Sequence, residues 1–499
     1  MSLPYFNCLI VDKFPYCYSK LNRVKYSRAH LFKVDIIILH KNLRLEDNSA
    51  LFYGSLNQNY KIIYVYDSHY WSVDGRSPRQ FSFLLDCLKE VQSNLKELNS
   101  SLEIFEGSYQ DLSAFIEINY PQSKIHLNHS TDTSYYRNQI SKFKDTFKGS
   151  TRLKVYEDFG IQTEKFNRDR WSFDWNKQMR KRLHDLPKRN LFDQSKDLMQ
   201  FDCFLDRSKK NIQKGFQQGG TKAANRLLTS FFETRSEGYS KKMSSPHEAE
   251  ESCSRLSPHI AFGSISIREI YQKLEAHYPL SNFKKDLYSF RKRLYWHCHF
   301  IQKLETEPAI EFNSMHSMCD DLRPLENKEF IDRWINGETG FPFMDACMLY
   351  LREKGWINFR MRAMIMSFAS YNLWQPWQST SPLLGELFVD YEPGIHIPQV
   401  QMQSGVTGIN LPRIYSVNKQ SSDQDPEAKW IKQIIPTLND IDPKKIHSAD
   451  LHTTYISPVV DLKESSKYAR DTIWSIRKGD EFKKIARSVY HKHGSRKRS

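Results

Sequence analysis

The stretch VDIIIL, residues 34–39, is the first of five short apolar runs rich in β-branched residues. The other four are KIIYVYD (61–67), LEIFEG (102–107), KIHLNHS (124–130) and LKVYEDF (153–159). Runs of this length and composition predict buried strands. They alternate with helical stretches, of which the clearest is 78–99, where an initial proline is followed by a stripe of Phe, Leu and Val. Strands that alternate with helices predict a parallel, doubly wound sheet.

After about residue 216 the strand-like runs stop, and the apolar residues take up helical spacing. Examples are ISIREIYQKLEAHY (265–278), DLYSFRKRLYWHCHFIQKLE (286–305) and INFRMRAMIMSFASYNLW (357–374). The expected fold class is an α/β N-terminal domain with a doubly wound parallel sheet, followed by an all-α C-terminal domain. The expected divisions are a basic N-terminal extension at 1–33, the α/β domain at 34–160, a connector at 161–215, the all-α domain at 216–490 and a basic tail at 491–499.

Composition sets broad limits on the class of protein. The 499 residues include 31 Phe, 26 Tyr and 10 Trp, which supply enough apolar surface for folded cores. No apolar run approaches the ~20 residues that span a bilayer, so we expect a soluble protein without a membrane partner. The eight cysteines are scattered and form no C-x-x-C pair. An intracellular, reducing compartment therefore fits best, and a cysteine-based metal site loses support.

Most of the formal net charge of +15 lies at the two ends of the chain. Residues 1–33 contain six basic side chains and one acidic, and residues 483–499 contain seven basic and none acidic. The body between them is nearly balanced, so the charge permits nucleic-acid binding without demonstrating it. Residues 1–33 lack periodicity, and one interpretation is a transit peptide for an organelle. A nucleus or a bacterial cytoplasm is equally compatible with two basic ends.

Residues 390–405 read DYEPGIHIPQVQMQSG and place two carboxylates and a histidine within seven positions. Asp390, Glu392 and His396 flank a Pro-Gly step, which indicates a turn. Three kinds of partner fit against it: a metal ion, a substrate proton or a larger flat group. A metal-dependent enzyme that uses these three side chains is one hypothesis, and it predicts a bound divalent cation and no yellow colour.

The segment ESCSRLSPHIAFGSISIREI, residues 251–270, combines hydroxyl side chains with one arginine ahead of a helical pattern. Hydroxyls, backbone N–H groups and a guanidinium are the donors that hold a phosphate group. The simpler alternative is a plain helix N-cap formed by Ser264 or Ser266.

A long apolar helical pair at 339–377, interrupted at Gly355, contains two arginines near its middle. Arg360 and Arg362 are two positions apart, so they point to different faces of a helix, and one of them must face inward. A buried arginine needs a carboxylate, for which Asp390 and Glu392 are the candidates.

Five motifs resemble those of the photolyase/cryptochrome family. They are KNLRLEDNSALF after the first strand, and SRLSPHIAFGSIS, WINGETGFPFMDACM, GWINFRMRAMIMSF and LPRIYSVNKQ in the helical half. The likeness runs from about Val34 to the C-terminus, with the motifs in order. It implies a U-shaped FAD inside the helical domain, with its ring edge against residues 390–405, so that the flat group is a flavin. The N-terminal sheet of this family can also hold an antenna chromophore of folate or deazaflavin type, whose identity stays open.

The resemblance implies contacts to the cofactor residue by residue. The positions that match phosphate-cradling residues are Tyr239, Ser254, Arg255, Leu256 and Ser257. Arg362 and Asp390 match an ion pair beside the flavin ring, and Glu392 matches the next carboxylate position. His396 matches the side chain that faces flavin N5, where most light-driven repair enzymes have Asn, so a change in protonation at N5 is expected.

The resemblance also implies a pocket for a flipped-out pyrimidine dimer. Trp296 matches the aromatic residue that stacks on the dimer, Arg413 matches an arginine near the pocket, and Met402 replaces the pocket's second aromatic residue. A dimer is poorly stacked, so flipping it costs less than flipping an intact pair. Catalytic roles are expected for Trp296, Arg413, His396 and Met402, and DNA contacts for Arg293, Trp296, His297, Phe359 and Arg360.

Several positions depart from the family pattern. Arg293 stands where the best-known repair enzymes place a glutamate, and Phe359 stands where they usually place an asparagine. Val400 replaces the tryptophan nearest the flavin in the usual three-tryptophan electron chain, of which Trp377 alone is retained. Trp374, one helical turn before Trp377, is a candidate start for a different route, so these two tryptophans are the predicted electron-transfer residues.

Three activities remain open on these grounds. Light-driven repair of cyclobutane pyrimidine dimers, the deoxyribodipyrimidine photo-lyase activity, is favoured because the short basic tail differs from the long extensions of cryptochromes. A cryptochrome-like blue-light photoreceptor is an alternative, since the lesion contacts are altered. Repair of (6-4) photoproducts is another, given His297 and His299. The expected partner is ultraviolet-damaged DNA, and we expect a monomer in a compartment that contains DNA.

Overall fold

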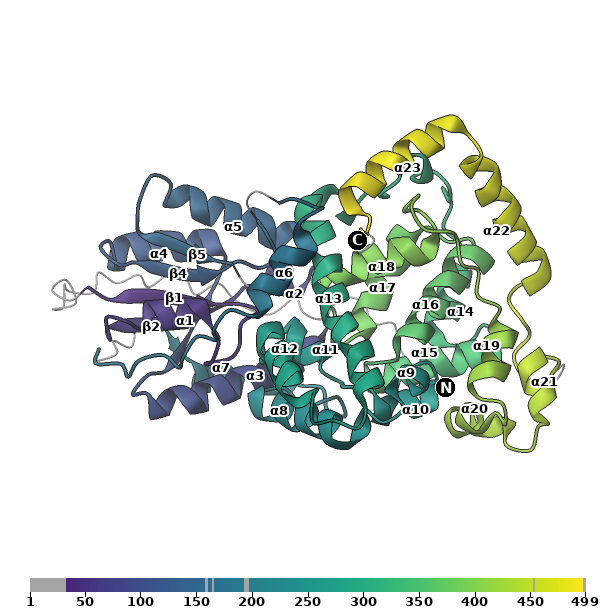
Figure 1. Cartoon of the computed structure of the whole chain (residues 1–499), viewed down its shortest axis with the longest axis horizontal. Coiled ribbons are helices and arrows are strands. Elements are labelled where there is room, and N and C mark those ends of the chain that lie inside the picture. The colour runs from purple at the N-terminus through teal and green to yellow at the C-terminus, as the bar shows by residue number, and fades with distance from the viewer. Residues whose placement is uncertain (1–32, 158–159, 164–165, 193–196, 452–453, 497–499) are drawn as a thin grey trace.

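The computed structural model describes residues 33–496, apart from 158–159, 164–165, 193–196 and 452–453. An α/β half contains the sheet, and the described residues of the other half form helices and loops (Figure 1). The expected fold class is therefore confirmed. Residues 1–32 of the expected N-terminal extension lie outside the described residues, as do residues 497–499 of the expected tail. The expected domain boundaries stay predictions.

Among the described residues, the sheet contains the five predicted strands and one short addition. The strands are β1 (Asp35–Leu39), β2 (Tyr60–Tyr66), β3 (Leu102–Glu106), β4 (Ile125–Asn128), β5 (Leu153–Tyr156) and β6 (Met199–Gln200). Their order is β5-β4-β1-β2-β3-β6, and every pair is parallel except β3 with β6. The sequence analysis missed β6 because two residues are too few for a hydrophobic pattern.

Helices cover both faces of the sheet. In chain order they are α1 (Ser49–Gly54), α2 (Ser68–Trp71), α3 (Pro78–Glu97), α4 (Tyr109–Asn119), α5 (Ser134–Thr146) and α7 (Phe201–Ser208). The intervening α6 (Trp171–Met179) packs against α12 (Ile267–His277) of the helical half. Ile37 and Leu39 of β1 share a core with α3 and α7, whereas Ile36 and Ile38 share one with α4 and α5 (Figure 1). A central strand that is buried on both faces is typical of parallel sheets. The predicted helix at 78–99 is confirmed as α3.

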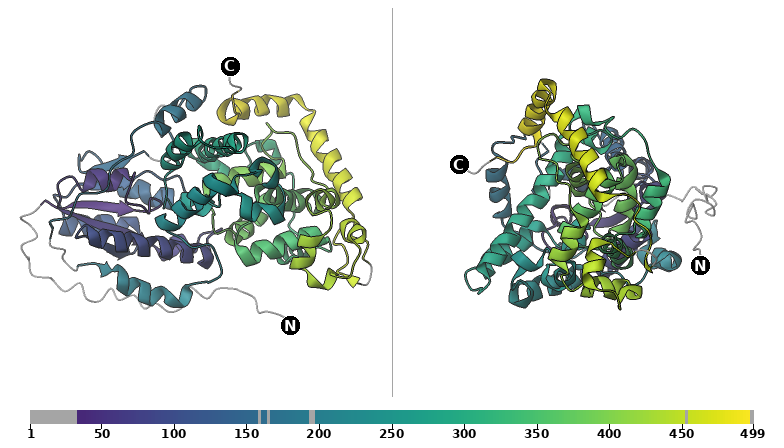
Figure 2. Two further views of the ribbon diagram at one scale, coloured as in Figure 1. Left: turned by 60° about the horizontal axis from the view of Figure 1, so that its bottom comes forward. Right: turned by 90° about the vertical axis from the view of Figure 1, so that its right-hand side faces the viewer.

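The helical half encloses a large apolar core, and α13 packs along α18. Its helices are α8 (Thr221–Ser230), α9 (Tyr239–Lys242), α10 (Pro246–Ser252), α11 (Ser257–Ala261), α12 (Ile267–His277), α13 (Lys284–Thr306), α14 (Lys328–Asn336), α15 (Pro342–Lys354), α16 (Phe359–Ser367), α17 (Trp377–Leu387), α18 (Pro393–Ser404), α19 (Val417–Gln424), α20 (Lys429–Ile434), α21 (Pro443–Ser448), α22 (Leu462–Arg477) and α23 (Asp480–His493). Figure 2 shows α22 and α23 on the outside of this half. No helix in the described part of the chain combines the length and apolar character that a bilayer span requires.

The two halves meet closely at Gly263, between α11 and α12. Its φ is +69°, and a Cβ atom there would lie 1.9 Å from the carbonyl oxygen of Lys41, which follows β1. Arg44 donates a hydrogen bond to the Gly263 carbonyl at 3.1 Å, and Leu43 donates to that of Phe262 at 3.2 Å. Glycine is required here for both its backbone conformation and its size. The loop after β1 is thus attached directly to the helical half.

Two local expectations were wrong, and each lies near a proline. Trp374 does not lie one helical turn before Trp377, because the π-helical segment Phe368–Asn372 ends first and α17 begins at Trp377. Trp374 has φ +55°, and Pro376 disfavours helical backbone in the residue before it. The Pro-Gly step in residues 390–405 starts α18 instead of forming a turn, since Pro393 occupies the first helical turn and Glu392 caps Gly394 N at 3.3 Å.

Candidate functional site

An ion pair between α16 and the segment before α18 is the centre of the site. Arg362 donates to both oxygens of Asp390, from Nη1 at 3.0 Å and from Nη2 at 2.9 Å. Its Nε donates to the Ile357 carbonyl at 2.7 Å, and its guanidinium lies 4.1 Å from the ring centroid of Phe388. Asp390 is nearly fully buried. Of the two carboxylates that the sequence allowed as the partner of Arg362, Asp390 is the one used, in the bidentate geometry that arginine favours.

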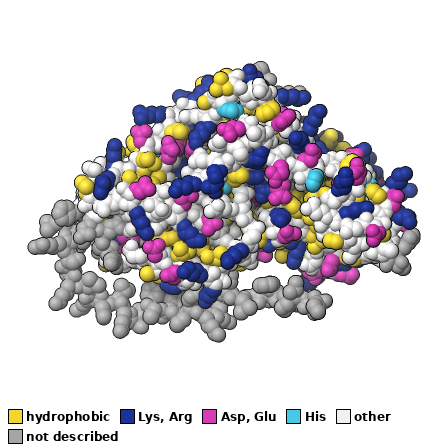
Figure 3. Space-filling model, turned by 90° about the horizontal axis from the view of Figure 1, so that it is seen from below, with side chains coloured by type: hydrophobic (Ala, Val, Ile, Leu, Met, Phe, Trp, Pro, Cys, Tyr) yellow, Lys and Arg dark blue, Asp and Glu magenta, His cyan; other side chains and the backbone are white. Residues whose placement is uncertain are grey.

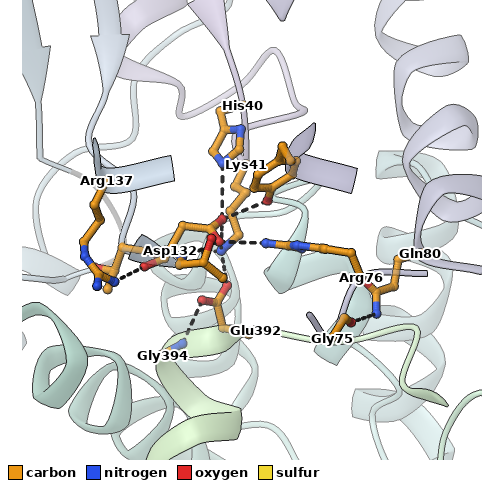
Figure 4. Close-up of polar contacts among 12 residues, drawn as sticks. His40, Lys41, Gly75, Arg76, Gln80, Asp132, Arg137, Glu392 and Gly394 are labelled. Carbon is orange, nitrogen blue, oxygen red and sulfur yellow. Dashed lines mark hydrogen bonds and ion pairs between the residues drawn. The ribbon is translucent and has the colours of Figure 1, made fainter. Parts of the chain in front are cut away.

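Glu392 instead points to the α/β half. Its carboxylate lies 2.7 Å from Lys41 Nζ, and both side chains are buried. Lys41 Nζ is also 3.1 Å from Asp132 Oδ2, so this lysine lies between two carboxylates from different halves (Figure 4). Burial raises the pKa of the Glu392 carboxyl, and Asp132 raises it further against the opposing effect of Lys41. The role of Glu392 in cofactor binding stays a prediction.

Asp132 is the hub of this buried charge network. It accepts from Arg76 Nη2 at 2.7 Å and from the Tyr70 hydroxyl at 2.9 Å, and its Oδ2 is 3.3 Å from His40 Nε2 (Figure 4). Burial favours the neutral acid, but Lys41 and Arg76 outweigh it and hold the pKa of Asp132 well below its ordinary value. Burial lowers the pKa of His40 to about 4, so this ring is neutral at physiological pH.

Sequence reasoning missed this network, although one indication was available. Lys41 follows β1 and Asp132 follows β4, and these strands are neighbours in the sheet. The carboxyl ends of neighbouring parallel strands lie at the same edge, which is where such sheets place polar groups. The contact with Glu392 needs the packing of the two halves, which no local pattern reveals.

His396 lies on the first turns of α18, half-buried against Phe388 and Tyr391. Its Nε2 is 2.9 Å from the carbonyl oxygen of Ser381, which can only accept, so Nε2 carries the hydrogen. Burial lowers the pKa of His396 to about 4, and the ring is therefore neutral at physiological pH. Nδ1 then has a free lone pair and acts as a hydrogen-bond acceptor.

We expect nitrogen-15 NMR to find His396 neutral, with the hydrogen on Nε2, from pH 6 to 8. Its signal is the one lost in His396→Asn, and the exposed His491 serves as the reference ring. Because its pKa lies near 4, the ring should titrate only in acid. A doubly protonated ring at pH 6, or a hydrogen on Nδ1, would contradict the assignment.

The predicted phosphate-cradling residues lie on α9 and before α11. Tyr239 and Leu256 are buried, Ser254 is half-buried and Ser257 is exposed. Arg255 adopts φ +59°, and its guanidinium lies 4.0 Å from the ring centroid of Trp356. The simpler alternative is also present, since Ser266 caps α12 by accepting from Glu269 N at 2.9 Å. Segment 254–257 is separate from this cap and leads into α11.

Several arginines lie near Cys253 and make its surroundings positively charged. Burial raises the pKa of this thiol to about 11, and four arginines oppose that rise: Arg255, Arg235, Arg293 and Arg362. Several polar atoms here are buried without a hydrogen-bond partner, namely Arg255 Nε, Asn358 Oδ1 and Ser252 Oγ. Buried polar groups ordinarily have partners, so these atoms suit a polar ligand. The donor set fits the diphosphate and polar edges of an FAD.

The predicted substrate residues cluster around the middle of α13. Trp296 is half-buried, with the ring of His299 edge-on at 4.8 Å between centroids and that of Phe300 at 5.9 Å. On the same helix, Arg293 is exposed and its guanidinium lies 6.0 Å from the ring centroid of Phe359 at the start of α16. These residues therefore bring α13 and α16 together at the surface.

The remaining predicted DNA and substrate residues are more dispersed. His297 lines a small pocket between the halves, together with Lys41 and Glu392. Arg360 is half-buried, with Nη1 3.5 Å from Gln420 Oε1. Met402 is half-buried on α18, which packs against α13, and Arg413 is exposed in the loop before α19. Their roles stay predictions.

The two predicted electron-transfer tryptophans lie in different environments. Trp377 is buried in the main helical core, and its Nε1 donates to Ser314 Oγ at 3.2 Å. Trp374 packs at the edge, with the Arg323 guanidinium at 4.6 Å and the ring of Tyr468 at 5.0 Å. Tyr468 is exposed, so this pair reaches the surface near α22.

The metal hypothesis requires Asp390, Glu392 and His396 to share one ligand. Instead, they face Arg362, Lys41 and the Ser381 carbonyl respectively. Across the described part of the chain, no three His, Cys, Asp or Glu side chains form a group that could hold a metal ion. The geometry therefore does not bring these three side chains to a common metal ion.

Known proteins resemble this chain in both halves. The family model for DNA photolyase matches residues 36–153, and the model for the FAD binding domain of DNA photolyase matches residues 290–475. A deoxyribodipyrimidine photo-lyase of Alkalihalophilus pseudofirmus is 29% identical over 268 residues, which are 50% of this chain and 54% of that protein. The chain thus spans about half the length of that relative.

Longer matches include relatives with other names. A (6-4) DNA photolyase of Arabidopsis thaliana is 23% identical, over 83% of this chain and 80% of its own, and a cryptochrome DASH of Danio rerio is 23% identical over 87% and 92%. Among solved structures, an archaeal photolyase from Sulfolobus tokodaii with two FAD molecules has a TM-score of 0.75 and 25% identity, over 89% of this chain and all of that one. With a matching family model in each half and the matches in order, the chain belongs to the DNA photolyase/cryptochrome family.

Proposed function

We propose that the protein is a light-dependent repair enzyme whose substrate is a cyclobutane pyrimidine dimer in DNA. The placement of Trp296 carries this proposal: a half-buried ring, backed by His299 and Phe300, lies on a helix that also bears the exposed Arg293. An aromatic platform beside a basic side chain suits a base that has been turned out of a duplex. Bound FAD would supply light absorption and the single electron that splits the dimer.

The chain's own residues would prepare the site for that chemistry. Arg255, Arg235 and Arg293 bring positive charge near Cys253, where a diphosphate would bind, and the buried Nε of Arg255 has no hydrogen-bond partner among the described residues. Arg362 is held by Asp390 and Phe388, so its guanidinium is oriented before a ligand arrives. Preorganised charge of this kind costs little reorganisation when the reaction occurs. His396 would present Nδ1 as a hydrogen-bond acceptor beside the flavin ring.

The environments of two histidines favour dimers over (6-4) photoproducts. Burial lowers the pKa of His297 to about 3 and that of His299 further. His299 is held by Arg168, and His297 lines the pocket with Lys41 and Glu392. Neutral rings held in this way are poorly placed to donate a proton to a lesion. A blue-light photoreceptor remains the second candidate, because a cryptochrome DASH is among the relatives.

Illumination of the purified protein with ultraviolet-damaged oligonucleotides tests the proposal. Dimers should be lost while (6-4) photoproducts persist, with the two lesions assayed separately. Loss of (6-4) products alone would assign the other repair activity, and loss of neither would favour the photoreceptor. An intracellular compartment that contains DNA and a monomeric state belong to the same proposal.

Trp296→Ala should weaken binding to dimer-containing duplexes by about 5- to 150-fold, since stacking contributes about 1–3 kcal/mol per base. Affinity is measured by fluorescence anisotropy in the dark, so that repair does not interfere. Trp474→Ala on α22 is the matched control, because that tryptophan is 41% exposed and lies outside the site. Equal affinities of Trp296→Ala and the unmodified chain would remove Trp296 from the lesion pocket.

A further inference from the structure

The C-terminal helix α23 carries a basic stripe on its exposed face. On the face shown in Figure 3, Lys and Arg side chains are interspersed with Asp and Glu. On α23, Phe482 and Val489 are buried, and the exposed basic side chains lie on the opposite face at helical spacing: Lys483, Lys484, Arg487 and His491. The match to the FAD binding domain ends at residue 475, so this helix lies beyond it.

A chain of contacts ties the end of α23 to the proposed lesion pocket. Arg168 donates from Nε to the Gly494 carbonyl at 2.9 Å and from Nη2 to that of His493 at 3.3 Å. Arg168 also donates to the ring of His299, which packs edge-on against Trp296. Arg168 thus links the C-terminal end of α23 to His299, whose ring contacts Trp296.

Nearby carboxylates neutralise only part of the basic stripe. Glu307 is already paired with Lys492 at 2.7 Å and with His493, and Asp169 is paired with Arg496. Lys483 pairs with Asp480 in the first turn of the helix. Neither Lys484 nor Arg487 forms an ion pair among the described residues, although the exposed Asp480 and Glu481 lie on the preceding turn, so the stripe keeps a net positive charge that faces solvent.

We propose that α23 is a DNA-binding arm whose exposed stripe contacts the phosphate backbone beside the damaged base. This inference rests on the proposed function, because Trp296 locates the base. The helix has 14 residues and so is roughly 21 Å long, the span of about six base steps. An anionic membrane fits less well, because the apolar face of the helix already packs on the protein core and has nothing to insert.

The test uses the full chain with Lys484→Glu and Arg487→Glu together, and a duplex with or without one dimer. Lys444→Glu with Lys445→Glu on α21 is the control, which changes charge equally on exposed residues at the far end of the helical half (Figure 1). The α23 variant should bind both duplexes at least about tenfold more weakly in the dark. The slope of log Kd against log salt should fall by roughly 2, as for two lost phosphate contacts, and the preference for the dimer should persist.

If the α23 variant has the same salt dependence of DNA binding as the unmodified chain, α23 is not a DNA-binding arm. The same holds if the variant loses affinity only for vesicles that contain phosphatidylserine. An equal loss in the α21 control would also overturn the proposal, because the effect would then be one of net charge alone. The proposed function fails separately, if the unmodified chain shows no preference for the dimer. In that case, the slope of log Kd against log salt for undamaged duplex still tests whether α23 binds DNA.

Discussion

Replacing Asp132 with Asn is expected to lower the free energy of unfolding by about 3–5 kcal/mol, the usual cost of removing one partner from a buried ion pair. The carboxylate is fully buried and faces Lys41, Arg76, Tyr70 and His40. Without the Asp132 carboxylate, Arg76 has no ion-pair partner among the described residues. Lys41 then has only Glu392 as an ion-pair partner among those residues. Urea unfolding at pH 7, followed by circular dichroism, measures the change.

The matched control is Glu427→Gln, whose ion-pair partner Lys429 is equally exposed, and it should leave the unfolding midpoint unchanged. The two variants should also differ in their response to acid. Because the pKa of Asp132 is held well below its ordinary value of 3.8, its stabilisation is complete above that value and is lost as the pH falls further. The difference in free energy of unfolding between Asp132→Asn and the unmodified chain should therefore become smaller below about pH 4. Equal midpoints of Asp132→Asn and Glu427→Gln at pH 7 would contradict the role of the network.

Arg362→Ala should remove most of the flavin, with Kd rising at least about tenfold, which corresponds to 1.4 kcal/mol. The variant leaves Asp390 buried without its cation, so the segment before α18 must rearrange to hydrate it. Arg362→Lys should retain an intermediate amount, since an ammonium group cannot form the two parallel hydrogen bonds to Asp390. The ratio of absorbance near 450 nm to that at 280 nm after gel filtration measures occupancy.

Arg360→Ala is the control, because it removes an arginine two positions away whose polar contact is with Gln420. Its flavin content should match that of the unmodified chain. Circular dichroism of both variants separates loss of flavin from loss of fold. Full occupancy in Arg362→Ala would show that the ion pair does not contribute to cofactor binding.

The sequence predicts the elements whose patterns are local and strong. Five strands and α3 follow from short apolar runs and a helical stripe, because burial imposes those spacings directly. Burial alone predicts that Arg360 or Arg362 pairs with Asp390 or Glu392, and the family resemblance singles out the pair Arg362–Asp390, which the structure contains. Family resemblance was needed to suggest a flavin, because no residue pattern here specifies one.

Tertiary contacts explain most of what sequence reasoning missed. Lys41 and Glu392 are 351 positions apart, and nothing near either one in the chain indicates the other. The helical pattern breaks at Trp374, two residues before Pro376, which disfavours helical backbone at Gln375. The basic residues of the tail were noted as net charge, but their arrangement as a stripe depends on which face of α23 is buried.

The charge network across the two halves limits how the chain can be recombined with its relatives. Lys41, Arg76 and Asp132 come from the sheet side, and Glu392 begins a helix on the other. A transplant of the helical half onto a homologue that lacks a basic side chain at the place of Lys41 would leave Glu392 buried without its counterion, whereas Lys41, Arg76 and Asp132 would stay together in the α/β half. Gly263 adds a steric condition, since any larger residue there collides with the loop that bears Lys41. The two halves of this protein therefore depend on each other for the Lys41–Glu392 ion pair and for the close contact at Gly263.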